Sequence, residues 1–125
     1  MDSDNLYFDV DFVGQYFRRE SPHPKHFFVE VLHLFLSETD KRMKGLSQLI
    51  QDHAEIVPTL HYLKGSASQV GGKLFSSTLE LAEETAKSNS TISTEEWARI
   101  WDVWQNTKRA IEKWLNAVEN PQIST

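Results

Sequence analysis

Apolar residues recur at helical spacing along most of the chain, and no segment alternates with the period of a β-strand. The longest apolar stripe, from Phe28 to Ile50, predicts a helix over about residues 25–51. Shorter stripes predict a first helix over residues 6–18 and two later helices over 74–87 and 94–118. A further helix ends at Gly71-Gly72, because two consecutive glycines end a helix or bend it.

Two four-residue patterns predict where helices begin. Ser93-Thr94-Glu95-Glu96 fits a capping box and places the start of the last helix. Asp52-His53-Ala54-Glu55 fits the same pattern, and we expect it to open the helix that ends at Gly71-Gly72. Pro58 complicates this second expectation, because proline is accommodated only in a first turn, which moves the start toward Val57.

Short connections between successive long helices make neighbouring helices antiparallel. The sequence therefore predicts an all-α fold, an up-down antiparallel four-helix bundle with a short extra N-terminal helix. We expect a single domain over residues 1–125, with the cap helix and a proline-containing loop at 1–24, the bundle at 25–118 and a tail at 119–125.

Composition excludes several classes of protein. The chain has 125 residues, 39% of them hydrophobic, a formal net charge of −5 and no cysteine. The acidic balance disfavours nucleic-acid binding, and the lack of cysteine excludes disulfides and thiolate chemistry. An acidic N-terminus with no apolar segment after it, and no apolar run of about 20 residues, predict a chain without a membrane span. We expect a cytoplasmic protein.

The helix that contains His61 has an unusual polar face. Its apolar face is formed by four residues, Leu60, Leu63, Ala67 and Val70. The opposite face carries an imidazole, a lysine one turn later and small residues: His61, Lys64, Gly65, Ser68 and Gly72. Glycine within a helix costs about 0.5–1 kcal/mol relative to alanine, so helix stability does not explain this face. Access does, because a partner backbone can approach the imidazole closely.

The string from His61 to Ser66, with Gly71 ten residues after the histidine, resembles the His-x-x-Lys-Gly-Ser signature of the histidine-containing phosphotransfer (HPt) family. The stretch from Phe28 to Leu46 is similar to the preceding helix of the stand-alone plant and fungal members, and the resemblance covers residues 25–118. It implies that Nε2 of His61 carries the phosphoryl group. It also implies that a partner receiver domain brings Mg²⁺, so that this chain needs no metal or cofactor.

The chemistry of phosphoryl transfer gives each neighbour of His61 an expected role. Lys64 would stabilise the phosphoryl oxygens, and Gly65, Ser68, Gly71 and Gly72 would let the receiver domain approach. In many eukaryotic members an amide, usually glutamine, lies 22 residues after the histidine and binds the imidazole. Glu83 occupies that position here. Its carboxylate is a candidate acceptor for Nδ1–H, although it adds negative charge near the phosphoryl group.

We interpret the chain as a phosphorelay intermediate of the stand-alone type, a phosphocarrier and not a self-sufficient enzyme. It would accept a phosphoryl group from the receiver domain of a hybrid sensor kinase and pass it to a response regulator, in the cytoplasm and in the nucleus. We expect a monomer that binds neither ATP nor nucleic acid nor a membrane. Two alternatives remain: an HPt domain excised from a larger hybrid kinase, and a helical adaptor that binds receiver domains without carrying phosphate.

Other aromatic and histidine residues have ordinary explanations. The tryptophans of the last helix are expected in the core or at its boundary. Four N-terminal aromatics either close one end of the bundle or lie partly exposed on the docking surface, which the resemblance slightly favours: Phe8, Phe12, Tyr16 and Phe17. His23 and His26 lie at a proline-rich turn without a third metal ligand, and His33 and His53 are expected on the surface.

Overall fold

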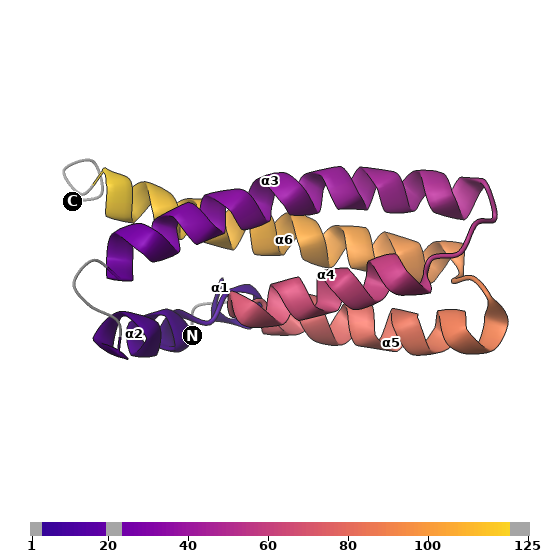
Figure 1. Cartoon of the computed structure of the whole chain (residues 1–125), viewed down its shortest axis with the longest axis horizontal. Helices are drawn as coiled ribbons and strands as arrows, with labels where there is room; N and C mark the ends of the chain where they lie inside the picture. The colour runs from indigo at the N-terminus through magenta and orange to yellow at the C-terminus, as the bar shows by residue number, and fades with distance from the viewer. Residues whose placement is uncertain (1–3, 20–23, 121–125) are drawn as a thin grey trace.

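A computed structural model describes the backbone of residues 4–19 and 24–120, and their side chains except those of residues 4, 14, 16–19 and 24–26. Within these residues the chain forms helices and no strand (Figure 1). The helices are α1 (Asp4–Tyr7), α2 (Val10–Arg19), α3 (Pro24–Gln51), α4 (Val57–Gln69), α5 (Lys73–Asn89) and α6 (Thr94–Glu119). The prediction of an all-α fold is confirmed.

The four long helices form an up-down bundle. In Figure 1, α3 and α5 run in one direction, and α4 and α6 return in the other. Helix α4 lies against α5, which follows it through a short connection, and α6 lies behind α3, which closes the bundle. The predicted four-helix arrangement is therefore present, and the long helix expected over 25–51 is α3, which begins at Pro24.

The core lies along the bundle axis and is built from one stripe of each helix. In α3 this stripe includes Phe28, Leu32, Met43 and Leu46, each at most 2% exposed. Trp104 of α6 is fully buried between two aromatic rings, in edge contact with Phe35 and stacked on Phe75. Trp101 is 37% exposed and lies against Trp97, beside Lys44 and Ser47 of α3.

The N-terminal helix is split, so the prediction of one helix over 6–18 is wrong. The break falls at Asp9, whose side chain accepts a hydrogen bond from the backbone N–H of Phe12 (3.2 Å) and thereby caps α2. The backbone N–H of Asp9 donates to the carbonyl oxygen of Gly71 (3.0 Å). A contact with the α4–α5 turn therefore takes the N–H that a continuous helix would use.

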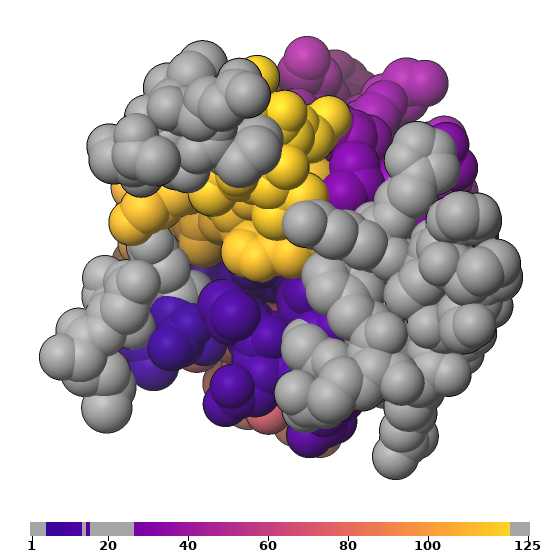
Figure 2. All heavy atoms as spheres, turned by 90° about the vertical axis from the view of Figure 1, so that its left-hand side faces the viewer, coloured from indigo at the N-terminus to yellow at the C-terminus, as the bar shows by residue number. Residues whose placement is uncertain are grey.

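The N-terminal segment closes one end of the bundle. Phe8 is 1% exposed and meets the ring of Trp114 edge-on, and Phe12 is partly buried. Figure 2 shows this end, with the indigo N-terminal segment beneath the yellow last turns of α6. Burial of Phe8 fits the alternative in which these aromatics close the end of the bundle, while the side chains of Tyr16 and Phe17 lie outside the described residues.

The corner between α3 and α4 differs from the predicted capping box. His53 has a positive φ of 55°, and the N–H of Ala54 donates back to the carbonyl oxygen of Leu49 (2.9 Å). This geometry ends α3 with a left-handed residue rather than opening the next helix. The capping box at 52–55 is therefore wrong, and α4 begins at Val57 with Pro58 in its first turn.

The corner between α5 and α6 follows the prediction more closely. The hydroxyl of Ser93 accepts a hydrogen bond from the N–H of Glu96 (3.1 Å), which is the expected cap. The carboxylate of Glu96 accepts a hydrogen bond from Thr85 of α5 (3.3 Å) and so ties the two helices together. Helix α5 continues to Asn89, two residues beyond its expected end, and closes at Ser90 with a φ of 71°.

Candidate functional site

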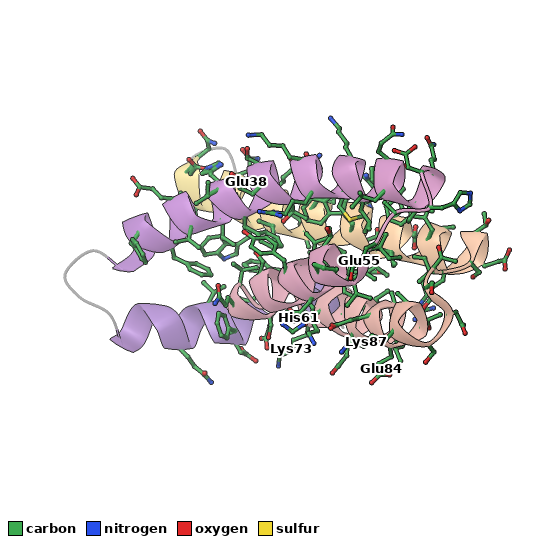
Figure 3. All side chains as sticks on the ribbon, turned by 45° about the vertical axis from the view of Figure 1, so that its right-hand side comes forward. Glu38, Glu55, His61, Lys73, Glu84 and Lys87 are labelled. Carbon is green, nitrogen blue, oxygen red and sulfur yellow. The ribbon has the colours of Figure 1, made fainter. Side chains whose placement is uncertain are left out.

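The imidazole of His61 lies on the outer face of α4. The four residues expected on the inner face are all buried: Leu60, Leu63, Ala67 and Val70. Their burial fixes the rotation of the helix, so the side chain of His61 is 68% exposed. Backbone rigidity comes from the packed face, and access comes from the opposite one. Figure 3 shows His61 on the side of the molecule that α4 and α5 share.

Glu83 of α5 lies directly behind the imidazole. Its Oε2 is 3.0 Å from Nδ1 of His61, and its side chain is only 4% exposed. The contact requires a proton on Nδ1, because a carboxylate can only accept, and this tautomer leaves the lone pair on Nε2. The imidazole is thus held by a buried anion with its outer nitrogen toward solvent.

Two lysines neutralise this buried carboxylate. Nζ of Lys64 lies 3.0 Å from Oε1 of Glu83, in an ion pair that is not a well-aligned hydrogen bond. Nζ of Lys87 lies 3.3 Å from Oε2, the oxygen that also contacts His61. Burial acts to raise the pKa of Glu83, but contacts with Lys64, His61 and Lys87 outweigh it and leave that pKa below its ordinary value. The carboxylate is ionised at neutral pH.

Lys87 is the residue of this cluster that sequence reasoning missed. It follows Glu83 by four residues on α5, so the two side chains lie on one face of the helix. That spacing was readable in the sequence. What was not readable is that α5 turns this face toward His61, because the rotation depends on packing against α4.

Gly65 and Ser68 lie beside the imidazole on the exposed face of α4. A Cβ at Gly65 would meet no atom within 4 Å, so the space above this part of the helix is open. The backbone below is held, since the hydroxyl of Ser76 donates to the carbonyl oxygen of Lys64 (3.1 Å). These positions have the small side chains that close approach of a partner requires, and this role stays a prediction.

Gly71 and Gly72 are buried, which corrects the expectation that both are open to a receiver domain and that Gly72 shares the exposed face of His61. Helix α4 ends at Gln69, so neither glycine continues the helical register that placed Gly72 beside His61. Gly71 has a φ of +85° and lies against Phe12 and Asp9, whereas Gly72 lies against Ala67 and Thr107. The N-terminal segment therefore packs closely against Gly71, and the core packs closely against Gly72, so both glycines serve contacts within this chain.

The two glycines Gly71 and Gly65 should respond to alanine in opposite ways. Gly71→Ala places a Cβ at a positive φ, 3.3 Å from the Phe12 ring, and should lower the free energy of unfolding by about 1–2 kcal/mol. Gly65→Ala adds a methyl group in open space within a helix and should raise it by about 0.5–1 kcal/mol. Urea titration of both variants checks this, and a loss at position 65 would contradict the described helix.

An ion pair holds the N-terminal segment to the α4–α5 turn. Nζ of Lys73 lies 2.6 Å from Oδ2 of Asp9. The hydrogen bond from Lys73 is the main cause of a pKa of Asp9 below its ordinary value, and Asp9 in turn raises the pKa of Lys73. Figure 3 shows Lys73 and His61 on the same side of the molecule.

The clamp predicts a pH-dependent contribution to stability. Because the pKa of Asp9 is lower in the folded state, the contribution is present above pH 3.8, its ordinary pKa. It is lost as the pH falls through the lower, folded value. Asp9→Asn should therefore destabilise the protein at pH 7, and the difference from wild type should shrink progressively below about pH 4. Urea titrations of the wild type and of Asp9→Asn at pH 7 and below pH 4 measure this difference in stability. A difference that does not depend on pH would mean that the ion pair is not its cause.

The other histidines lie away from this cluster or outside the described side chains. His33 is on the surface and pairs with Glu119 (3.0 Å), and His53 is exposed at the end of α3. His23 lies outside the described residues, as does the side chain of His26. Across the described part of the chain, no three acidic or histidine side chains are grouped so that they could hold a metal ion.

Comparison with protein families decides the relationship. The model of the Hpt domain family matches residues 30–121, well over half of the chain. The chain belongs to the Hpt family. Neither a search of curated proteins nor a search of solved structures returned a match. Family membership assigns this Hpt protein a histidine phosphotransfer role in a phosphorelay and receiver domains of two-component proteins as partners.

No helix of the described residues has the length and apolar character to cross a bilayer.

Proposed function

We propose that His61 is the phosphorylated residue of this Hpt protein. The protein accepts a phosphoryl group from an aspartyl phosphate in the receiver domain of a hybrid sensor histidine kinase. It then passes the group to an aspartate of a response regulator. The observation that supports this is the exposed imidazole of His61, held at Nδ1 by the ionised carboxylate of Glu83 (3.0 Å).

The transfer step follows from this geometry. The lone pair of Nε2 attacks the phosphorus of the aspartyl phosphate, an N–P bond forms, and the P–O bond breaks with its electron pair on the aspartate. No proton has to leave the imidazole, which keeps Nδ1–H and becomes a cation. Glu83, the acceptor for that proton, stabilises the ring charge and orients the ring, as the aspartate of a hydrolase triad does for its histidine. The reverse attack returns the phosphoryl group to an aspartate.

The remaining groups fit a carrier rather than a complete enzyme. Lys64, one turn from His61 and paired with Glu83, supplies a positive charge that stabilises the phosphoryl oxygens from its place beside the imidazole. The partner receiver domain contributes Mg²⁺ and the acidic pocket, as the resemblance to the family implies. The open space above Gly65 and the exposed Ser68 leave room for that domain's loops.

The finer assignment is a stand-alone protein of the plant and fungal type. Its support is the similarity of residues 28–46, now seen as the central part of α3, to the corresponding helix of those members. In such relays the carrier connects a kinase with nuclear regulators, so we place its action in the cytoplasm and the nucleus. We also propose a monomer, because the face around His61 is reserved for the receiver domain.

The experiment that tests the function is phosphoryl transfer to the purified protein. Receiver domains of plant and of fungal type, phosphorylated on aspartate, are mixed with it, and the product is treated with acid and with alkali. A label that acid removes and alkali spares identifies phosphohistidine. Failure of active receivers of both types to label the protein while they still bind it would overturn the carrier proposal and favour the adaptor.

A further inference from the structure

Two lysines converge on one carboxylate at this site, and they differ in freedom. Nζ of Lys64 lies 3.0 Å from Glu83, with 26% of the Lys64 side chain exposed. Nζ of Lys87 lies 3.3 Å from the same carboxylate, with 61% of its side chain exposed. Lys87 contacts the very oxygen that binds Nδ1 of His61, so its ammonium group is adjacent to the imidazole. Figure 3 shows His61 and Lys87 on the same side of the molecule.

We propose that Lys87 is a second phosphoryl-binding residue, kept beside His61 by Glu83 and drawn to the phosphoryl oxygens once Nε2 is phosphorylated. The inference rests on the proposed function, since it names a further residue of the same site. It concerns a side chain of this protein that acts after the phosphoryl group has been transferred to His61.

The charges of the site support this assignment. With a neutral imidazole, Glu83 balances one of the two lysines, and one positive charge remains in excess. Phosphoryl transfer converts the side chain of His61 into a cationic ring bearing a dianionic group, which adds one net negative charge. The excess lysine therefore becomes neutralised when His61 is phosphorylated. Without Lys87 the unphosphorylated site would be neutral, and the phosphorylated site would carry an unbalanced negative charge.

The geometry favours Lys87 as the lysine that moves. Its contact with Glu83 is the longer of the two, and its side chain is the more exposed, so less is lost when it turns outward. Lys64 can remain on the buried Oε1 of Glu83, which has no well-aligned hydrogen bond from the described residues and would otherwise lie unpaired. The unbranched stem of lysine provides the required reach.

The quantity to measure is the equilibrium constant for phosphoryl exchange between this protein and a receiver domain. This equilibrium constant depends only on the free proteins and their phosphorylated forms. A mutation that weakens docking of the receiver domain therefore leaves the constant unchanged, provided that little of the protein is in the complex. Lys87→Gln should lower the equilibrium constant for transfer to His61 by roughly three- to tenfold at low ionic strength. Lys87→Arg keeps the positive charge and should have a constant close to that of the wild type. Lys44→Gln, an exposed lysine beside Trp97 and Trp101 with the same charge change, should leave it unaltered.

A second background separates direct contact from an effect through Glu83. If Lys87 binds the phosphoryl oxygens, Lys87→Gln should lower the constant by a similar factor in a Glu83→Gln protein. If it acts only by pairing with Glu83, the effect should vanish there, and the inference is overturned. If the wild type is labelled and Lys87→Gln has an unchanged equilibrium constant, the inference about Lys87 is also overturned. Absence of label on the wild type overturns the proposed function itself. Circular dichroism confirms that each variant is folded.

Discussion

Replacement of His61 by glutamine should abolish phosphoryl acceptance and leave the bundle intact. An amide nitrogen has no available lone pair, so no N–P bond can form, and labelling by a phosphorylated receiver should fall below detection. The side chain is 68% exposed, and its partner Glu83 keeps both lysines, so the free energy of unfolding should change by less than about 0.5 kcal/mol. The amount of acid-labile label after incubation with the phosphorylated receiver measures phosphoryl acceptance. A urea titration measures the free energy of unfolding.

His33 provides a matched control for this variant. Its imidazole also lies 3.0 Å from a carboxylate, that of Glu119, but both partners are about half exposed and no lysine pairs with that carboxylate among the described contacts. His33→Gln should therefore label as the wild type does. A label that persists in His61→Gln and disappears in His33→Gln would move the phosphorylated residue to α3 and contradict the proposed site. Receiver binding by His61→Gln should persist, because the surrounding surface is unchanged.

The long helices are readable from the sequence because each is one continuous apolar stripe. Residues 25–51 were expected to be helical, and α3 covers Pro24–Gln51. The apolar face of α4 places Leu60 and Leu63 in the core, and the geometry of a helix then turns His61 outward. Local periodicity thus predicts the long helices and the exposure of the imidazole, since neither depends on which helices meet.

The errors have two causes, a tertiary contact at the N-terminal segment and a backbone torsion at the end of α3. Asp9 divides the N-terminal helix because its backbone N–H binds Gly71, more than sixty residues away. The same contact buries Gly71, which periodicity alone could not show. At residues 52–55 a left-handed His53 ends α3, although the letters Asp and Glu fit a capping box equally well. In each case a tertiary contact or one backbone torsion decided between local alternatives.

Prediction of the site was partial for a related reason. The motif identified His61 and Lys64, and the position of Glu83 suggested a partner for the imidazole. The place of Lys87 depends on the rotation of α5 against α4, which Phe75 and Leu79 establish by their complete burial. The chemistry of the site is therefore set partly by the core beneath it.

Truncation of Trp104 to alanine should give the largest loss of stability in the bundle. The side chain is fully buried, its ring stacks on Phe75 at 5.3 Å, and its indole N–H donates to Asp40 (3.1 Å). Removing so large a buried ring leaves a cavity, and Asp40 loses the indole donor while it keeps its ion pair with Lys108. The expected cost is about 3–5 kcal/mol, a large share of the roughly 5–15 kcal/mol that stabilises a domain. The midpoint of urea unfolding followed by circular dichroism measures it.

Trp101→Ala is the matched control, three residues earlier on the same helix. Its side chain is 37% exposed and contacts Trp97 at a centroid distance of 6.0 Å, so its loss should cost less than about 1 kcal/mol. Because Phe75 lies on the helix that carries Glu83 and Lys87, Trp104→Ala should also slow labelling of His61 under conditions in which Trp101→Ala does not. Equal losses of stability in the two variants would mean that Trp104 is not the residue that joins α5 and α6 in the core.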